Sequence, residues 1–114
     1  MSRKGRLSAA VVQDSAPVFA ALGDETRLRL VARLSERGPQ SIARLAEGEP
    51  VTRQAITKHL RVLADAGVAR DQRRGRERLW ALERRSLDEA RRCLDLVSQD
   101  WDEALARLKA FVET

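Results

Sequence analysis

Apolar residues near the C-terminus recur at alternating intervals of three and four, the spacing of a coiled-coil seam. The seam comprises Leu87, Ala90, Leu94, Val97, Trp101, Ala104, Leu108 and Phe111. A helix over residues 86–112 would be roughly 39 Å long at about 1.5 Å per residue. The rest of a 114-residue chain is too small to cover such a seam completely. We therefore expect part of the seam to pack on its own domain and the remainder to face a second copy of the chain.

The expected dimer interface combines this C-terminal helix with the first helix of the chain. Its predicted members are Val18, Phe19, Leu22, Leu94, Val97, Trp101, Leu105, Leu108 and Phe111. Such an interface would make the protein a homodimer that associates through its terminal helices.

Two helices are predicted in the N-terminal third. The first covers residues 15–22 with Pro17 in its first turn, and residues 1–13 before it are expected to form a loose basic arm. The second begins after Asp24, which suits an N-cap, and ends at Gly38. Helical spacing predicts that its core-facing residues are Leu28, Val31, Ala32 and Leu34. The domain proper is thus expected to span residues 14–114.

The middle of the chain has the start and stop signals of a helix-turn-helix. A brief helix is predicted over residues 42–46 with Ser41 as its N-cap. After a tight turn, Thr52 suits the next N-cap, and the helix over residues 53–66 ends where Gly67 favours a left-handed C′ position. In a helix-turn-helix, the second helix enters the major groove of DNA.

The predicted second helix has one apolar side and one polar side. Ile56, Leu60 and Leu63 form a stripe suited to the core. The opposite side carries amide, hydroxyl, amine and guanidinium groups, which bind base edges and phosphates. The expected DNA-binding residues here are Arg53, Gln54, Thr57, Lys58 and Arg61. A solvated face is the alternative, but the preceding turn and the basic segment that follows favour DNA.

Three further residues are secondary candidates for DNA contact: Ser41, Thr52 and His59. The histidine lies on the flank of the apolar stripe, so two interpretations are open. It packs at the boundary of the core, which is the more common role, or it reaches DNA from the edge of the helix.

Strands are predicted over residues 68–73 and 78–82, with Gly75 at the turn between them. The arginines around this turn, Arg73, Arg74 and Arg76, are expected to lie along the DNA backbone or enter a minor groove. The alternative is an exposed edge hairpin that its charge keeps soluble. After the hairpin, Ser86 and Glu89 have the spacing of a capping box that opens the last helix.

Charge is distributed unevenly along the chain, which has a net charge of +5. Residues 37–85 contain 12 basic and 6 acidic side chains, whereas residues 86–114 contain 4 basic and 7 acidic ones. The middle segment is therefore the expected contact surface for a polyanion.

Several classes of function are disfavoured. With one histidine, one cysteine and no glycine-rich phosphate loop, the chain offers no nucleophile–base pair, so an enzyme is not expected. No apolar stretch is long enough to cross a membrane. The single Cys93 fits a reducing cytoplasm and is interpreted as a packed residue, with a redox-sensing thiol as the alternative.

Several segments in a fixed order resemble the ArsR-type (arsenic-repressor) winged helix-turn-helix regulators. They are residues 22–28 (LGDETRL), 42–46 (IARLA), 55–63 (AITKHLRVL), 66–68 (AGV) and 73–76 (RRGR), and the resemblance covers about residues 17–112. It implies a mainly α fold with a small β-hairpin, in the order α-α-α-α-β-β-α, and a homodimeric repressor that binds an inverted repeat in promoter DNA. The family's DNA contacts match Arg53, Gln54, Thr57 and Lys58, and its wing matches residues 73–76.

Metal-sensing members of that family carry cysteines in the helix that here reads IARLA, or histidine and carboxylate ligands in the last helix. This chain has neither set. The resemblance is therefore to the metal-free branch, and we expect no metal and no cofactor.

A winged-helix adaptor that binds proteins instead of DNA is the alternative function. Such an adaptor would carry acidic or apolar residues on the outer face of the second helix, where this chain has Gln54, Thr57, Lys58 and Arg61. The sequence identifies no small-molecule effector.

Overall fold

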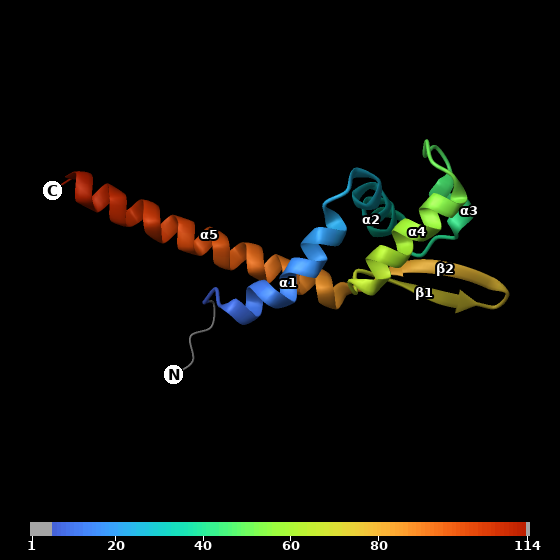
Figure 1. Cartoon of the computed structure of the whole chain (residues 1–114), viewed down its shortest axis with the longest axis horizontal. Helices are drawn as coiled ribbons and strands as arrows, with labels where there is room; N and C mark the ends of the chain where they lie inside the picture. The colour runs from blue at the N-terminus through green and yellow to red at the C-terminus, as the bar shows by residue number, and fades with distance from the viewer. Residues whose placement is uncertain (1–5, 114) are drawn as a thin grey trace.

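The order of elements in the computed structural model, which describes residues 6–113, is the predicted one. The elements are α1 (Ala9–Leu22), α2 (Glu25–Arg37), α3 (Ile42–Ala46), α4 (Arg53–Asp65), β1 (Ala69–Arg74), β2 (Glu77–Leu82) and α5 (Arg84–Glu113). Figure 1 shows α3, α4 and the hairpin at one end of the molecule and the C-terminal half of α5 projecting from the other. The longest dimension is 66 Å, which reflects this projection.

Side-chain caps start three of the helices where the sequence predicts them. The side chains of Asp24, Ser41 and Thr52 accept hydrogen bonds from the backbone N–H three residues later, at 3.0, 3.2 and 3.1 Å. Each cap satisfies a donor that the first helical turn leaves without an intrahelical partner. The predicted starts of α2, α3 and α4 are confirmed.

Helix α1 is longer than predicted. It begins at Ala9, where Ser8 Oγ accepts from the backbone N–H of Val11 at 3.3 Å, and it contains Pro17 in its interior. The expected loose arm over residues 1–13 is therefore wrong for residues 9–13, while residues 1–5 lie outside the described part of the chain. The physical reason is tertiary packing, because α1 lies along α5 and buries Ser15, Val18 and Ala21.

The core-facing side of α2 also differs from the prediction. Leu30 and Leu34 are buried, whereas Leu28 is 53% exposed and Ala32 is exposed. α2 packs against α4 and β2 through the row that contains Leu30 and Leu34. Since residues two apart on a helix point about 200° apart, Leu28 faces solvent.

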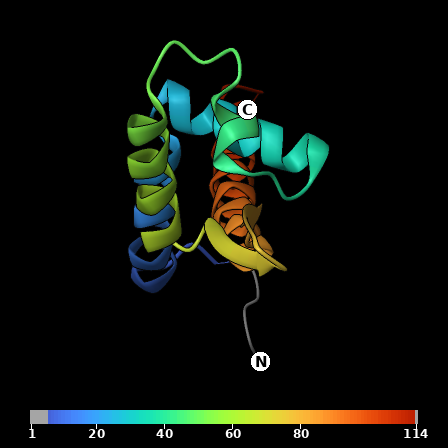
Figure 2. The same cartoon turned by 90° about the vertical axis from the view of Figure 1, so that its right-hand side faces the viewer.

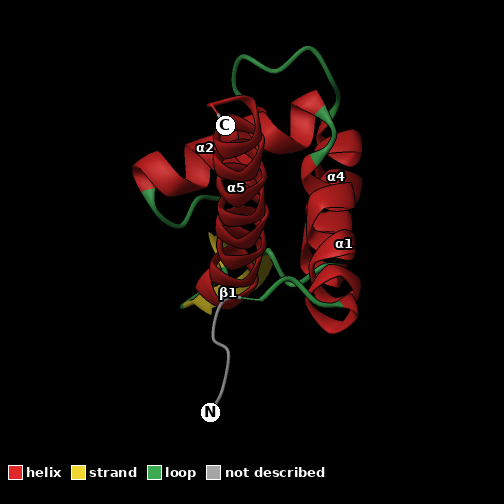
Figure 3. Ribbon diagram, turned by 90° about the vertical axis from the view of Figure 1, so that its left-hand side faces the viewer, coloured by secondary structure: helices red, strands yellow, loops and turns green. Residues whose placement is uncertain are grey.

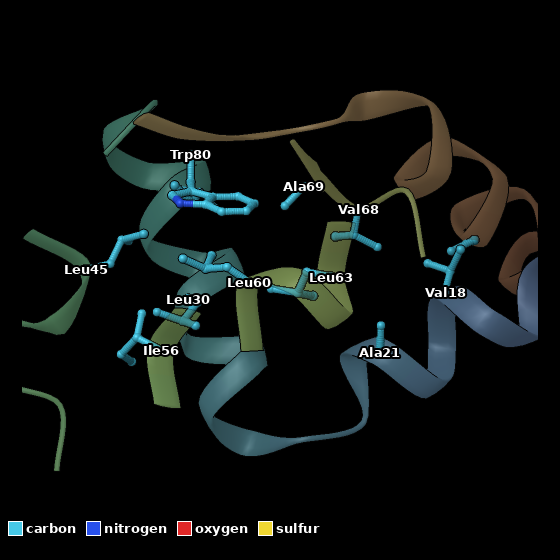
Figure 4. Packing of buried hydrophobic residues seen from close by; sticks show 12 residues of the cluster. Val18, Ala21, Leu30, Leu45, Ile56, Leu60, Leu63, Val68, Ala69 and Trp80 are labelled. Atoms are coloured by element: carbon cyan, nitrogen blue, oxygen red, sulfur yellow. The ribbon is translucent and has the colours of Figure 1, made fainter. Parts of the chain in front are cut away.

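The apolar stripe of α4 occupies the centre of the core, as predicted. Ile56, Leu60 and Leu63 are each 0% exposed. Figure 4 shows Leu60 between Leu30 of α2 and Trp80 of β2, with Ile56 and Leu63 on either side. Val18 belongs to the same cluster and is 2% exposed, so it is not available to a partner, and its predicted place in the dimer interface is wrong.

The hairpin forms as predicted, with its strands displaced by one residue at most of their ends. β1 and β2 are antiparallel, Arg74 lies opposite Glu77, and Gly75 adopts φ +64° in the turn. An additional bridge was not predicted. The backbone N–H of Gln40 donates to the carbonyl of Trp80 at 2.9 Å, and the N–H of Trp80 donates back at 2.7 Å. This bridge ties the segment before α3 to the hairpin.

Helix α5 begins at Arg84, so the predicted capping box at Ser86 is wrong. Ser86 lies inside the helix and is buried, because its hydroxyl packs against Gly67 at the end of α4. The other buried residues of α5 are Ala90, Cys93 and Leu96. Figure 1 shows this helix extending beyond the other elements, and Figure 3 views it from its C-terminal end.

Replacing Gly67 with alanine is expected to destabilise the fold by about 2–4 kcal/mol. Gly67 has φ +78°, which costs other residues roughly 1–2 kcal/mol. A Cβ there would also lie 2.5 Å from Ser86 Oγ, and forced overpacking costs about 1–3 kcal/mol. Urea unfolding monitored by circular dichroism measures the change.

Gly75→Ala is the matched control, because a Cβ at that glycine meets nothing within 4 Å and only the backbone strain applies. The double variant Gly67→Ala/Ser86→Ala should recover part of the stability. Equal losses for the Gly67 and Gly75 variants would contradict the steric explanation.

Candidate nucleic-acid interface

The outward side of α4 carries the predicted polar groups. Arg53, Gln54, Lys58 and Arg61 are exposed, and Thr57 is half-buried. Over residues 6–113, the side chains of Arg53, Lys58 and Arg61 form no ion pair with a carboxylate. These cations are thus available to an external anion. Figure 2 views this end of the molecule, with α4, α3 and the hairpin on the side that faces the viewer.

Thr57 has a restricted hydrogen-bonding role. Its hydroxyl donates to the carbonyl of Arg53 at 3.0 Å, one turn earlier on α4. A hydroxyl has one proton and two lone pairs, so Thr57 retains the capacity to accept. Amino groups of adenine and cytosine are the donors that a major groove presents to such an acceptor.

The hydroxyls of Ser41 and Thr52 act primarily as helix caps. Both oxygens accept backbone N–H groups, which leaves each hydroxyl proton for another acceptor. A phosphate oxygen is such an acceptor, so the cap role and the predicted DNA role are compatible.

His59 connects α4 to the junction between α1 and α2. Its Nδ1 lies 3.2 Å from Arg27 Nη1 and 3.9 Å from Asp24 Oδ2. Arg27 Nε in turn donates to the carbonyl of Ala21 at 2.6 Å. A hydrogen bond from the backbone N–H of Arg27 lowers the pKa of Asp24, and the nearby positive charge of Arg27 acts in the same direction. This geometry supports the interpretation of His59 as a residue at the core boundary.

An ion-pair network that the sequence did not reveal holds the turn between α3 and α4. The side chain of Glu49 is only 2% exposed and lies 3.0 Å from Arg29 Nη2 and 3.8 Å from Arg33 Nη2. Arg33 also donates to the carbonyl of Leu45 at 2.8 Å. The hydrogen bond with Glu49 raises the pKa of Arg29, which also pairs with Glu25. The network ties the turn between α3 and α4 to α2.

The arginines of the hairpin fall into two groups. Arg70 pairs with Glu83 at 3.3 Å, and Arg78 pairs with Asp71 at 3.3 Å. In the described part of the chain, Arg73, Arg74 and Arg76 have no such partner and are exposed. The three arginines without a carboxylate are the ones that the sequence predicted to contact DNA.

A second exposed surface lies on α5, away from these cations. Its apolar residues are Leu94 (55% exposed), Val97 (45%), Trp101 (64%), Leu105 (46%), Leu108 (58%) and Phe111 (79%). Phe19 and Leu22 of α1 are half-buried and pack against the core. Apolar residues this concentrated on one helix face mark an interaction surface.

The described residues contain no group of three or more His, Cys, Asp or Glu side chains placed to hold a metal ion. Cys93 is buried against the domain rather than exposed on α5. Within residues 6–113, no helix combines the length and the apolar character that a membrane span requires.

Comparisons with known proteins match this architecture. A helix-turn-helix domain family matches residues 22–72. The chain is 37% identical to an ArsR-like transcriptional regulator from Rhodococcus sp. RHA1, with a TM-score of 0.78, covering 90% of this chain and 96% of that one. It is 34% identical to the helix-turn-helix-type transcriptional regulator Rv2034 of Mycobacterium tuberculosis, over 84% of this chain and 86% of the relative.

One further structure shows the fold alone. The homodimeric winged helix-turn-helix DNA-binding domain Mb0332 from Mycobacterium bovis is 21% identical, with a TM-score of 0.61, over 90% of this chain and 91% of that one.

The fold and the cationic end define a winged helix-turn-helix DNA-binding transcriptional regulator. The chain belongs to the ArsR-type family of these regulators. These relatives favour DNA binding as the function of the chain over the alternative of an adaptor that binds proteins.

Removing the carboxylate of Glu49 is expected to lower the free energy of unfolding by about 1–2 kcal/mol. Glu49→Ala leaves Arg29 and Arg33 without the carboxylate that accepts their hydrogen bonds. Hydrogen bonds to charged groups contribute about 1.5–3 kcal/mol, and solvent screening of the part-exposed arginines reduces this value. Urea unfolding measures the change. Glu47→Ala in the same turn is the control, because Glu47 is exposed and forms no ion pair with a described residue. If the two variants unfold at the same urea concentration, the network does not stabilise the turn.

Proposed function

We propose that this chain is a homodimeric repressor that binds an inverted repeat in promoter DNA. The observation that carries the proposal is the position of the cations without carboxylate partners. Six of these cations lie on α4 and on the hairpin, at the same end of the molecule (Figure 2), whereas others, such as Arg92, lie on α5. The ligand is double-stranded DNA, so the cytoplasm is the proposed compartment.

Within this proposal, α4 lies in the major groove and reads bases through Arg53, Gln54, Thr57 and Lys58. Arg61 and the hairpin arginines Arg73, Arg74 and Arg76 hold phosphates. Ser41 and Thr52 donate their hydroxyl protons to the DNA backbone. His59 supports α4 from the side that faces the rest of the domain. Phosphate contacts position the protein, while base contacts determine which sequence it prefers.

Dimerisation is proposed to occur through α5. The exposed stripe of Leu94, Val97, Trp101, Leu105 and Leu108 requires a cover, and a second copy offers the same stripe. The homodimeric state of the Mb0332 domain supports this choice. Two copies of α4 about 34 Å apart reach half-sites separated by one turn of DNA. No metal or other cofactor enters this function, and the structure identifies no effector.

Substitutions on α4 and on the hairpin should affect DNA binding in different ways. Gln54→Ala is expected to relax sequence preference at one base pair by about 1–3 kcal/mol, because it removes a group that contacts base edges. Arg76→Ala is expected to weaken binding to all sequences and to lower the slope of log affinity against log salt by about one. Binding-site selection from a random duplex library identifies the operator, and fluorescence anisotropy over a salt series measures both effects.

Failure of the wild-type dimer to bind the selected duplex or promoter DNA at low salt would sink the proposed function. A selection that yields no common sequence, with tight binding retained, would contradict base reading by α4.

Trp101→Glu is expected to convert the dimer to a monomer at micromolar concentration. A buried tryptophan at an interface contributes about 2 kcal/mol or more, so the dissociation constant should rise at least about 30-fold. Analytical ultracentrifugation measures the change, and circular dichroism checks that the helices remain. Gln99→Glu introduces the same charge on the opposite side of α5 and should leave the dimer intact. Equal dissociation constants for the dimers of the two variants would contradict an interface formed by α5.

A further inference from the structure

A polar hollow lies between α3 and the hairpin, beside the surfaces already described. Its lining includes Gln40, Ser41, Arg44, Arg74, Glu77 and Leu79. Its volume is about 340 Å³, well above the roughly 30 Å³ that one water occupies in the liquid, so a phosphate group fits. Neither the family resemblance nor the sequence pattern had singled out Arg44.

The frame of the hollow is rigid. The two backbone hydrogen bonds between Gln40 and Trp80 join its α3 side to β2, and Leu79 next to Trp80 is buried. Ser41 caps α3, and Arg33 holds the other end of that helix through the carbonyl of Leu45. The side chains of the hollow are therefore carried by backbone that is already fixed before any ligand binds.

The charge of the hollow is net positive. Arg44 of α3 and Arg74 of β1 enter its lining from opposite sides, and Glu77 is the acidic residue that lines it. In the described chain, neither guanidinium forms an ion pair with a carboxylate, Glu77 included. Two cations from separate elements beside one hollow are suited to a single anion, since guanidinium groups bind phosphate oxygens in a planar, bidentate way.

The position of the hollow indicates which anion. If α4 occupies the major groove and the hairpin tip approaches the adjacent minor groove, a sugar–phosphate strand separates the two grooves. The hollow lies between α3, which packs against α4, and the hairpin, so such a strand passes beside it. The hydroxyl of Ser41, whose oxygen accepts from the N–H of Arg44, still has a proton to donate there.

We propose that this hollow binds a backbone phosphate of duplex DNA between Arg44 and Arg74. The inference rests on the proposed function and adds Arg44 to its contacts. Glu77 opposes the phosphate and limits the strength of the contact. The phosphate bound here fixes the register of α4 relative to the hairpin, because the two arginines belong to two different elements.

Fluorescence anisotropy with a labelled duplex of arbitrary sequence, over a series of salt concentrations, tests the proposal. Each phosphate contact contributes about 0.9 to the slope of log affinity against log salt. Arg44→Ala is therefore expected to reduce that slope by up to about one and to weaken binding roughly 3- to 10-fold at about 0.1 M salt. Glu77→Gln is expected to strengthen binding, the opposite of the effect of Arg44→Ala. Arg92→Ala removes an exposed cation of α5, remote from the hollow, and should change neither quantity.

A double-mutant cycle tests whether one phosphate is shared. The Arg44→Ala/Arg74→Ala variant should lose less affinity than the two single variants together, because both guanidiniums hold the same group. Circular dichroism confirms the fold of each variant. If the affinity losses of the two single variants add up fully in the double variant, the two arginines do not share one phosphate. If Arg44→Ala has no more effect than Arg92→Ala while Arg76→Ala still weakens binding, the hollow does not bind a phosphate. That result leaves the proposed function standing. Absence of DNA binding by the wild-type chain overturns both.

Discussion

Burial of one side of α4 is the interaction on which the rest of the structure depends. Ile56, Leu60 and Leu63 are completely buried between α2 and Trp80. Removing such side chains from water stabilises a fold by roughly 1.5–3 kcal/mol each. Because a helix has two sides, burying this stripe directs the opposite, polar side outward. The same contact that forms the core therefore also exposes Gln54 and Lys58, which we propose to contact DNA.

Ion pairing separates the structural cations from those available to a ligand. Arg29 and Arg33 of α2 bind Glu49 in the turn of the helix-turn-helix, while Arg70 and Arg78 bind carboxylates along the hairpin. The arginines at the hairpin tip and the cations on the outer side of α4 have no carboxylate partner in residues 6–113. Net charge alone does not make this distinction, because it counts every arginine equally. Pairing alone does not single out one surface, because among the described residues α5 also carries cations without a carboxylate partner, Arg92 among them; the surface that a polyanion can neutralise is distinguished by the number of such cations on α4 and the hairpin.

Local signals in the sequence predicted much of the fold. Asp24, Ser41 and Thr52 mark helix starts because a side-chain cap needs only its own helix, and the stripe of α4 follows from helical spacing alone. Predictions that depended on a neighbour were less accurate. The start of α1 was missed because packing along α5 stabilises turns that have weak signals of their own. The core-facing side of α2 was assigned in part incorrectly, because its five apolar residues, which include both Leu28 and Leu30, are compatible with more than one helix face.

The sequence by itself determined the order of elements, the polar side of α4, and the arginines at the hairpin tip, because each depends on residues close together in the chain. Only the tertiary structure decided how the long α5 seam is divided. Leu87 and Ala90 of the seam pack against the core, while Leu94, Val97 and Trp101 remain exposed. It likewise decided the Glu49 network, the Gln40–Trp80 bridge and the hollow beside Arg44. These join residues that are distant in sequence, and no local pattern specifies which distant groups the packed core brings within a few ångströms.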